Sequence, residues 1–290
     1  RQYYRQEFSM REELQDSPQV FPIEDVYRIK NGYVVASRSN DKMSFLQPSE
    51  HSELPARLSD LHNCKEENII DFTSEYGLLG YTEMYVDSIS ATQKRNFYNS
   101  HHEWGDRVDW LMSHSACINR IINLLELLRV GDSSGVSDFL KEWKSETPTQ
   151  LKDLGVSYLA GVSSKFFRVT PPDSKPSTEA WQTITNIINS NTTPYISEVL
   201  YYPENQSDPL FRSYKSKTLL PLIYRHLGDL ALGLIQYYKC SYRKCSKRWT
   251  VNSDGRGPRN RYCPPKIGKE SLCSKKERYE RGKEKKVLIK

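Results

Sequence analysis

The sequence predicts an α+β protein, with a mainly helical body that carries short β-hairpins and a small cysteine-rich unit at the C-terminal end. Three observations predict this organisation. Apolar residues recur at helical spacing over several long stretches, an Asn-Gly pair lies inside an alternating apolar pattern, and four of the six cysteines lie close together near the C-terminal end. We therefore expect two units, residues 1–238 and residues 239–290.

The composition is that of a folded protein. A chain of 290 residues can bury a sizeable core, and although only 37% of residues are hydrophobic, 19 Tyr and 5 Trp add buriable area. No apolar run is long enough for a membrane span, and residues 1–5 lack the apolar core of a signal peptide. We expect a soluble, cytoplasmic protein without a membrane partner.

The first part of the chain predicts short elements. Residues 27–36 alternate apolar and polar side chains around Asn31 and Gly32, which is the strongest short-range signal for a β-hairpin. Residues 40–68 are polar and predict a loop. Residues 68–77 predict a short helix or turn closed by Gly77.

The central part predicts longer helices. Residues 103–130 carry apolar side chains at steps of three and four, which predicts a long amphipathic helix ending near Gly131. Residues 136–143 and 181–188 predict two more helices, the first stopped by Pro148. Residues 195–202 and 210–214 predict two strands, and the apolar residues 219–238 predict a helix that runs directly into Cys240.

Charge is distributed unevenly along the chain. Residues 239–290 hold 18 Lys and Arg against 5 Asp and Glu, a net charge of +13, whereas residues 1–238 have a net charge of −7. An acidic body followed by a strongly basic segment indicates a polyanionic partner for that segment, most simply nucleic acid. A solvated basic tail is the alternative interpretation.

The cysteines favour a structured segment. Cys240, Cys245, Cys263 and Cys273 have the spacing C-x4-C, 17 residues, C-x9-C, while Cys64 and Cys117 are isolated. Four clustered thiols in a segment with almost no apolar core favour one structural Zn²⁺ over disulfides, although two pairs of free thiols remain an alternative.

The residues between the cysteine pairs predict a hairpin. Residues 249–251 form one candidate strand, a Gly- and Pro-rich turn follows, and residues 259–262 form its candidate partner. Together these features predict a small four-cysteine zinc ribbon with arginines on its exposed face. Residues 274–286 have helix-compatible charge spacing and almost no apolar face, so we expect them to lie along a phosphate backbone.

The whole layout resembles a bacterial family of stress-linked transcriptional regulators, in which an ABATE-type region precedes a CGNR-type zinc ribbon. The resemblance extends over residues 68–286 and rests on residues 68–72, 76–79, 103–104 and 131–132, and on the apolar segment before the ribbon. In the family the ribbon holds a cysteine pair, an aromatic residue, an Arg-rich stretch ending in aromatic-Cys, a further Cys and a basic tail. Those places are taken here by Cys240, Cys245, Trp249, Arg259, Arg261, Tyr262, Cys263, Cys273, Lys275, Lys276 and Arg278. The Gly-Asn-Arg of the family is replaced after Cys273 by Ser-Lys-Lys.

No catalytic motif supports an enzyme. His101, His102 and Glu103, with His114, form the best candidate cluster, but adjacent residues on a helix point about 100° apart. His226 lies in an apolar segment, where a core histidine is expected. The carboxylates of Asp71 and Glu75 are expected to be exposed on one helical face.

Two functional hypotheses therefore stand, besides a third in which the body is a metal-independent hydrolase with a nucleic-acid-targeting tail. In the first, the chain is a zinc-ribbon nucleic-acid-binding regulator, with DNA as the expected partner, whose body senses a signal or mediates assembly. In the second, it is a protein-interaction or effector module of a bacterial stress or defence system, in which the acidic body binds a partner protein or a second copy. For the first hypothesis the expected nucleic-acid contacts are Arg248, Trp249, Arg256, Arg259, Arg261, Lys275, Lys276, Arg278 and Arg281.

Overall fold

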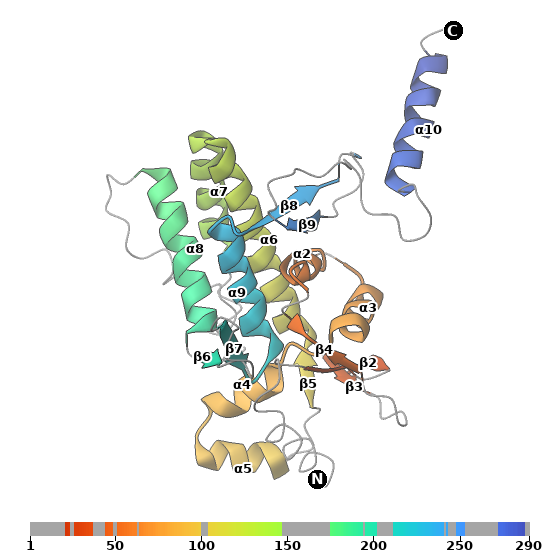
Figure 1. Cartoon of the computed structure of the whole chain (residues 1–290). Helices are drawn as coiled ribbons and strands as arrows, with labels where there is room; N and C mark the ends of the chain where they lie inside the picture. The colour runs from red at the N-terminus through yellow and green to blue at the C-terminus, as the bar shows by residue number, and fades with distance from the viewer. Residues whose placement is uncertain are drawn as a thin grey trace.

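The computed structural model describes residues 21–23, 26–36, 44–48, 51–62, 64–99, 104–146, 175–193, 195–201, 211–240, 242, 248–252 and 272–287. Within these residues the chain is mostly helical, and its short strands pair in antiparallel fashion (Figure 1). This confirms the predicted α+β class and the mainly helical body.

The strands form small separate sheets: β1 pairs with β4, β3 lies between β2 and β5, β6 pairs with β7, and β8 pairs with β9. Their bounds are β1 (Phe21–Ile23), β2 (Tyr27–Lys30), β3 (Tyr33–Ala36), β4 (Ser44–Leu46), β5 (Gly105–Arg107), β6 (Ile196–Tyr201), β7 (Phe211–Ser216), β8 (Ile235–Lys239) and β9 (Arg248–Asn252). The predicted hairpin at residues 27–36 is confirmed. Its turn residues Asn31 and Gly32 have φ angles of 53° and 77°, as a two-residue turn between twisted strands requires.

The described helices are α2 (Leu54–Ser59), α3 (Glu66–Tyr76), α4 (Tyr81–Ser88), α5 (Ala91–Asn99), α6 (Val108–Val130), α7 (Ser133–Glu146), α8 (Pro176–Thr192), α9 (Leu219–Ala231) and α10 (Leu272–Val287). The predicted helices around residues 68–77, 136–143 and 181–188 are confirmed as α3, α7 and α8, and the two predicted strands as β6 and β7. None of the described helices combines the length and apolar character needed to cross a membrane.

Helix α6 is the central element of the body, where α2, α7 and α8 all contact it, while α9 packs against α2 and α8 (Figure 1). Its apolar stripe recurs every three or four residues and is buried in the core, because that spacing places the side chains on one side of the helix. The buried members of this stripe are Trp110, Leu111, Ile118, Ile121, Ile122, Leu124 and Leu125.

The end of α6 was predicted correctly at Gly131. This glycine has a φ of 72°, and the N–H groups of Gly131 and Asp132 donate to the carbonyls of Leu128 and Leu127. The carboxylate of Asp132 then accepts from the N–H of Gly135 at 2.8 Å in the first turn of α7. The chain therefore reverses here, and α7 packs back against α6.

The predicted start of this helix at residue 103 is wrong, because the helix begins at Val108 and residues 105–107 form strand β5 on the edge of β3. Tertiary pairing overrides the helical pattern at this point. A β-carbon on Gly105 would lie 2.0 Å from the carbonyl oxygen of Val34, so only glycine allows the two strands to approach this closely.

The predicted loop over residues 40–68 is also wrong, since this stretch contains β4 and α2. Although the stretch is polar overall, the side chains of Leu54 and Leu58 in α2 are fully buried against the core. A helix of six residues is too short to give a visible period, so its burial comes from tertiary packing.

The predicted helix over residues 219–238 is wrong in its last third. Helix α9 ends at Ala231, Gly233 adopts a φ of 77°, and residues 235–239 form β8. The β-branched and aromatic residues after Gly233 favour a strand once a partner strand is present. The predicted unit boundary between residues 238 and 239 therefore falls inside β8.

Candidate metal centre and nucleic-acid interface

Cys240 lies at the end of the first strand of a β-hairpin. Strands β8 and β9 pair antiparallel up to Lys239 opposite Arg248, and Cys240 follows β8 immediately. The C-x4-C motif thus spans the connection between the two strands, and the side chain of Cys240 is only 6% exposed there. The sequence-predicted strand at 249–251 is confirmed, but it pairs with β8, which was not expected, while residues 259–262 lie outside the described part of the chain.

The fourth cysteine lies on the helix that faces this loop. Cys273 is half-buried in the first turn of α10. Glu280, two helical turns further on the same face, accepts a hydrogen bond of 3.0 Å from the hydroxyl of Tyr242. Tyr242 is 6% exposed and lies two residues after Cys240. Tyr242 therefore packs against the face of α10 that carries Cys273.

The structure does not test the complete four-cysteine site, because Cys245 and Cys263 lie outside the described residues. Within the described ranges, no three His, Cys, Asp or Glu side chains come together as a metal site. The two thiols that are described stand on a hairpin loop and a helix start, and this donor type suits a structural zinc ion. The four-cysteine centre stays a prediction.

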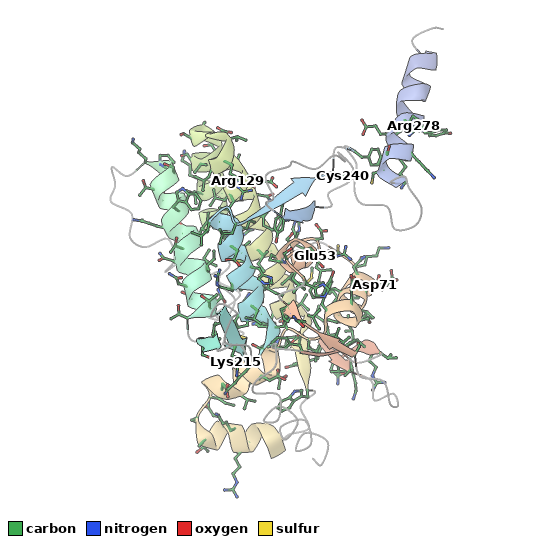
Figure 2. All side chains as sticks on the ribbon, viewed as in Figure 1. Glu53, Asp71, Arg129, Lys215, Cys240 and Arg278 are labelled. Carbon is green, nitrogen blue, oxygen red and sulfur yellow. The ribbon has the colours of Figure 1, made fainter. Side chains whose placement is uncertain are left out.

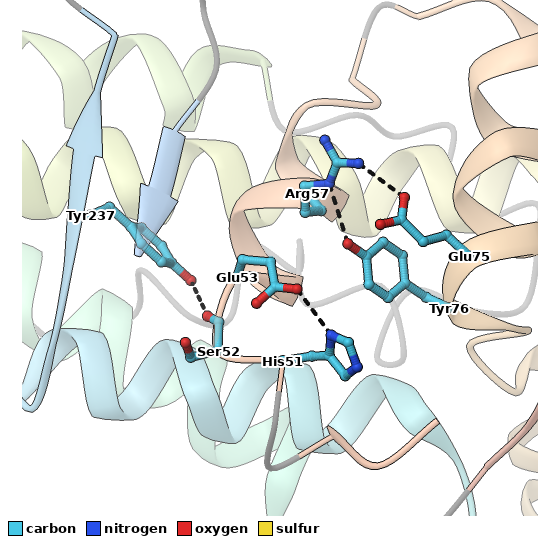
Figure 3. A network of polar contacts seen from close by, with 7 residues as sticks. All are labelled: His51, Ser52, Glu53, Arg57, Glu75, Tyr76 and Tyr237. Atoms are coloured by element: carbon cyan, nitrogen blue, oxygen red, sulfur yellow. Dashed lines mark hydrogen bonds and ion pairs between the residues drawn. The ribbon is translucent and has the colours of Figure 1, made fainter. Parts of the chain in front are cut away.

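The hairpin is attached to the helical body at its base. The hydroxyl of Tyr237 in β8 donates to the backbone carbonyl of Ser52 at 3.2 Å, and β9 contacts α2 (Figure 3). Since β8 also continues from α9 after only a short turn, the hairpin is joined to the body through both α9 and α2.

Polar contacts tie the same region of α2 to α3 (Figure 3). The guanidinium of Arg57 donates to the hydroxyl of Tyr76 at 3.3 Å and to the carboxylate of Glu75 at 2.9 Å. His51 and Glu53 pair at 3.0 Å just before the helix begins. Helix α2 is therefore fixed on both sides, and it provides a rigid support for the hairpin.

The predicted nucleic-acid contacts are only partly described. Lys275, Lys276 and Arg278 are exposed on α10, and Figure 2 shows Arg278 well away from the helical body. Arg248 and Trp249 belong to β9, and Arg281 belongs to the second half of α10. The remaining predicted contacts, Arg256, Arg259 and Arg261, lie outside the described residues.

Helix α10 separates its charges between two faces, which sequence reasoning missed. Glu277 and Glu280 are half-buried on the face of Cys273, whereas Lys275, Lys276, Arg278 and Tyr279 are exposed on the opposite face. The signal was present as glutamates at steps of three and four after Cys273. Tyr242, between the first two cysteines, was missed because its partner is 38 residues away.

The candidate catalytic residues are placed as follows. His114 is fully buried in α6, where its Nδ1 lies 2.9 Å from the hydroxyl of Tyr224. Burial raises the pKa of Cys117, one turn along, to about 12. Burial also lowers the pKa of His226. Asp71 and Glu75 are exposed on α3, while His101, His102 and Glu103 lie outside the described residues.

No family model, curated protein or solved structure matches this chain.

Proposed function

We propose that this chain is a zinc-ribbon nucleic-acid-binding regulatory protein, with DNA as its partner. The observation that carries the proposal is the charge distribution, +13 in residues 239–290 against −7 in residues 1–238. It is supported by the exposure of Lys275, Lys276 and Arg278 on α10. The resemblance to the ABATE/CGNR-type regulators points to the same function. The body would sense a signal or mediate assembly, through a partner protein or a second copy.

In this proposal one structural zinc ion is held by Cys240, Cys245, Cys263 and Cys273. The positions of Cys240 after β8 and Cys273 at the start of α10 support it, because the bond between Tyr242 and Glu280 brings their two segments together. Bound zinc would supply a tetrahedral thiolate centre that links the hairpin loop to α10. Such a link stabilises a segment that has too few apolar residues to form a core of its own.

The basic side chains would contact phosphates, whose charge they neutralise. Trp249 would pack within the hairpin or stack on a base, and the first role is favoured because a small ribbon has few other apolar residues to bury. The proposed contacts are Arg248, Trp249, Arg256, Arg259, Arg261, Lys275, Lys276, Arg278 and Arg281. The net negative charge of the body opposes binding elsewhere.

The test is the salt dependence of DNA binding by the full chain, measured by fluorescence anisotropy on a labelled duplex. Binding should fall steeply with salt, and the double variant Arg259→Ala, Arg261→Ala should reduce the log–log slope by about 1.8, since each lost phosphate contact contributes about 0.9. The control is Arg28→Ala, Arg95→Ala, which removes two exposed cations from the body and should leave the slope unchanged.

Absence of binding to any nucleic acid at low salt would overturn this proposal and favour the protein-interaction hypothesis. Equal effects of the two double variants would show that binding depends on overall charge alone and would remove the role proposed for Arg259 and Arg261.

A further inference from the structure

The two faces of α10 can be mapped residue by residue. An α-helix turns about 100° per residue, so Cys273, Glu277 and Glu280 lie within roughly 60° of one another. These three side chains are half-buried. The backbone position of Glu284 continues the same stripe. Every acidic residue of α10 therefore falls on the face that Tyr242 contacts.

The exposed face is wide. Lys275, Lys276, Arg278 and Tyr279 are the exposed residues of the described side chains in α10, and they span an arc of roughly 160° on the opposite side. Arg278 and Lys276 form the two edges of this arc. Lys275 and Tyr279, which is 66% exposed, lie in its middle.

The basic face is also long enough for groove binding. The backbone positions of Lys283 and Lys286 fall on the same arc, and that of Lys285 lies about 20° beyond its Arg278 edge. The distance along the axis from Lys275 to Lys286 is about 17 Å, or about five base pairs. Helix α10 stands beyond the outer end of the β8–β9 hairpin, away from the helical body (Figures 1 and 2). In these views α10 lies clear of the described helices of the body.

We propose that α10 lies in the major groove of duplex DNA, with Lys276 and Arg278 on opposite phosphate backbones and Lys275 and Tyr279 facing the base edges. This inference rests on the proposed function; it adds that the ligand is duplex DNA and that α10 is the element that contacts the bases. A groove places a phosphate backbone on each side of the inserted helix, which matches cations on both edges of the arc. A single strand would engage only one edge.

The same geometry selects DNA over RNA. The major groove of B-form DNA is about 12 Å wide and admits an α-helix, whereas the major groove of A-form RNA is too narrow for its bases to be read by side chains. An element of this width and charge pattern fits the first groove and not the second.

The hydrogen bond between Tyr242 and Glu280 fixes the rotation of α10 about its axis. It joins the acidic stripe to the segment after Cys240, and thereby turns the basic arc outward. Tyr242 is therefore a positioning residue, which acts on DNA through the orientation of the helix.

The first experiment compares binding of the full chain to a 20-base-pair DNA duplex, a duplex RNA of the same sequence and the single DNA strand, by anisotropy across a range of salt concentrations. We expect the DNA duplex to bind at least tenfold more tightly than the other two. The edge variant Lys276→Ala, Arg278→Ala should reduce the log–log salt slope on the duplex by about 1.8. The matched control Arg28→Ala, Arg95→Ala should not.

The second experiment tests the positioning contact. Tyr242→Phe keeps the ring but removes the donor, and should weaken duplex binding about 2- to 10-fold, the effect of one lost hydrogen bond. Glu280→Gln keeps an acceptor for the hydroxyl of Tyr242 and should bind at least as tightly as the unaltered chain. If the bond between Tyr242 and Glu280 served stability alone, Tyr242→Phe and Glu280→Gln would both change the melting temperature but would have the same affinity for duplex DNA.

Equal affinity for duplex DNA and either other probe, or an edge variant with the slope of its control, would overturn the groove assignment. The proposed function would still be tested separately, by the effect of the double variant Arg259→Ala, Arg261→Ala on the salt slope of DNA binding. Absence of binding to all three probes would overturn the proposed function together with this inference.

Discussion

At the scale of single residues, Asp106 links strand β5 to the segment that begins helix α4. Its carboxylate is fully buried and accepts the backbone N–H groups of Leu79, Gly80 and Tyr81, at 2.9 Å for Gly80 and 2.7 Å for Tyr81. Burial raises the pKa of Asp106 to about 7, against the three N–H donors, which lower it. This carboxylate therefore titrates close to neutral pH.

Asp106 should make the stability of the body depend on pH. Its folded-state pKa of about 7 lies above the ordinary aspartate value of 3.8, so the folded state binds the proton more tightly. The contribution of Asp106 to stability is fully present below about pH 4 and is lost as the pH rises through about 7, at up to about 1.4 kcal/mol per pH unit.

The variant Asp106→Asn cannot titrate at this position and provides the reference. Chemical unfolding of both proteins between pH 4 and pH 8 should show the unaltered chain losing stability relative to Asp106→Asn as the pH rises. A stability difference that stays constant over this range would contradict the assignment.

At the scale of elements, two kinds were predictable from the sequence: helices with an apolar repeat over several turns, and a hairpin whose turn requires particular residues. Helices α6, α7 and α8 repeat their apolar residues over several turns, and the β2–β3 turn holds Asn31 and Gly32. The local apolar pattern did not predict the secondary structure of segments that is set by tertiary contacts. Helix α2 is too short for a period, and β8 continues an apolar helix but pairs with β9.

The candidate site was predictable in its residue types but not in its arrangement. The four cysteines and the basic side chains stand out in the sequence because of their clustering. The pairing of β9 with β8, and the contact of Tyr242 with Glu280, depend on segments that are far apart in sequence or carry no local signal. Only the three-dimensional structure reveals which face of α10 is turned outward.

Helix α2 should contribute substantially to stability in spite of its six residues. Leu58 is fully buried between α6 and neighbouring elements, so Leu58→Ala should lower the free energy of unfolding by about 2–5 kcal/mol through lost burial and the remaining cavity. Leu58→Met conserves volume and should cost less than about 1.5 kcal/mol. Denaturant unfolding measures both, and equal small losses would show that α2 is loosely packed.

At the scale of the whole molecule, the body and the C-terminal unit are held together by different means. The body has an apolar core built on α6 and α9, and neither Cys240 nor Cys273, the two clustered cysteines that the structure describes, belongs to it. The C-terminal unit is attached to the body through β8, the contact of Tyr237 with Ser52 and the contact of β9 with α2. Within the unit, the bond between Tyr242 and Glu280 holds α10 to the segment after Cys240. We therefore expect the two parts to respond separately to loss of metal.

Removing the proposed zinc ion should destabilise α10 while the body stays folded. The purified chain should release about one equivalent of zinc to a chelator, and hydrogen exchange should then accelerate in α10 but not in α6, because α6 is buried among other helices. The double variant Cys263→Ser, Cys273→Ser should lose the zinc without chelator. Cys64→Ser is the matched control, since the thiol of Cys64 donates to the carbonyl of Asp60 at 2.9 Å and a serine hydroxyl can do the same. Undiminished zinc in the double variant, or exchange that accelerates equally in α6, would contradict a structural metal confined to the C-terminal unit.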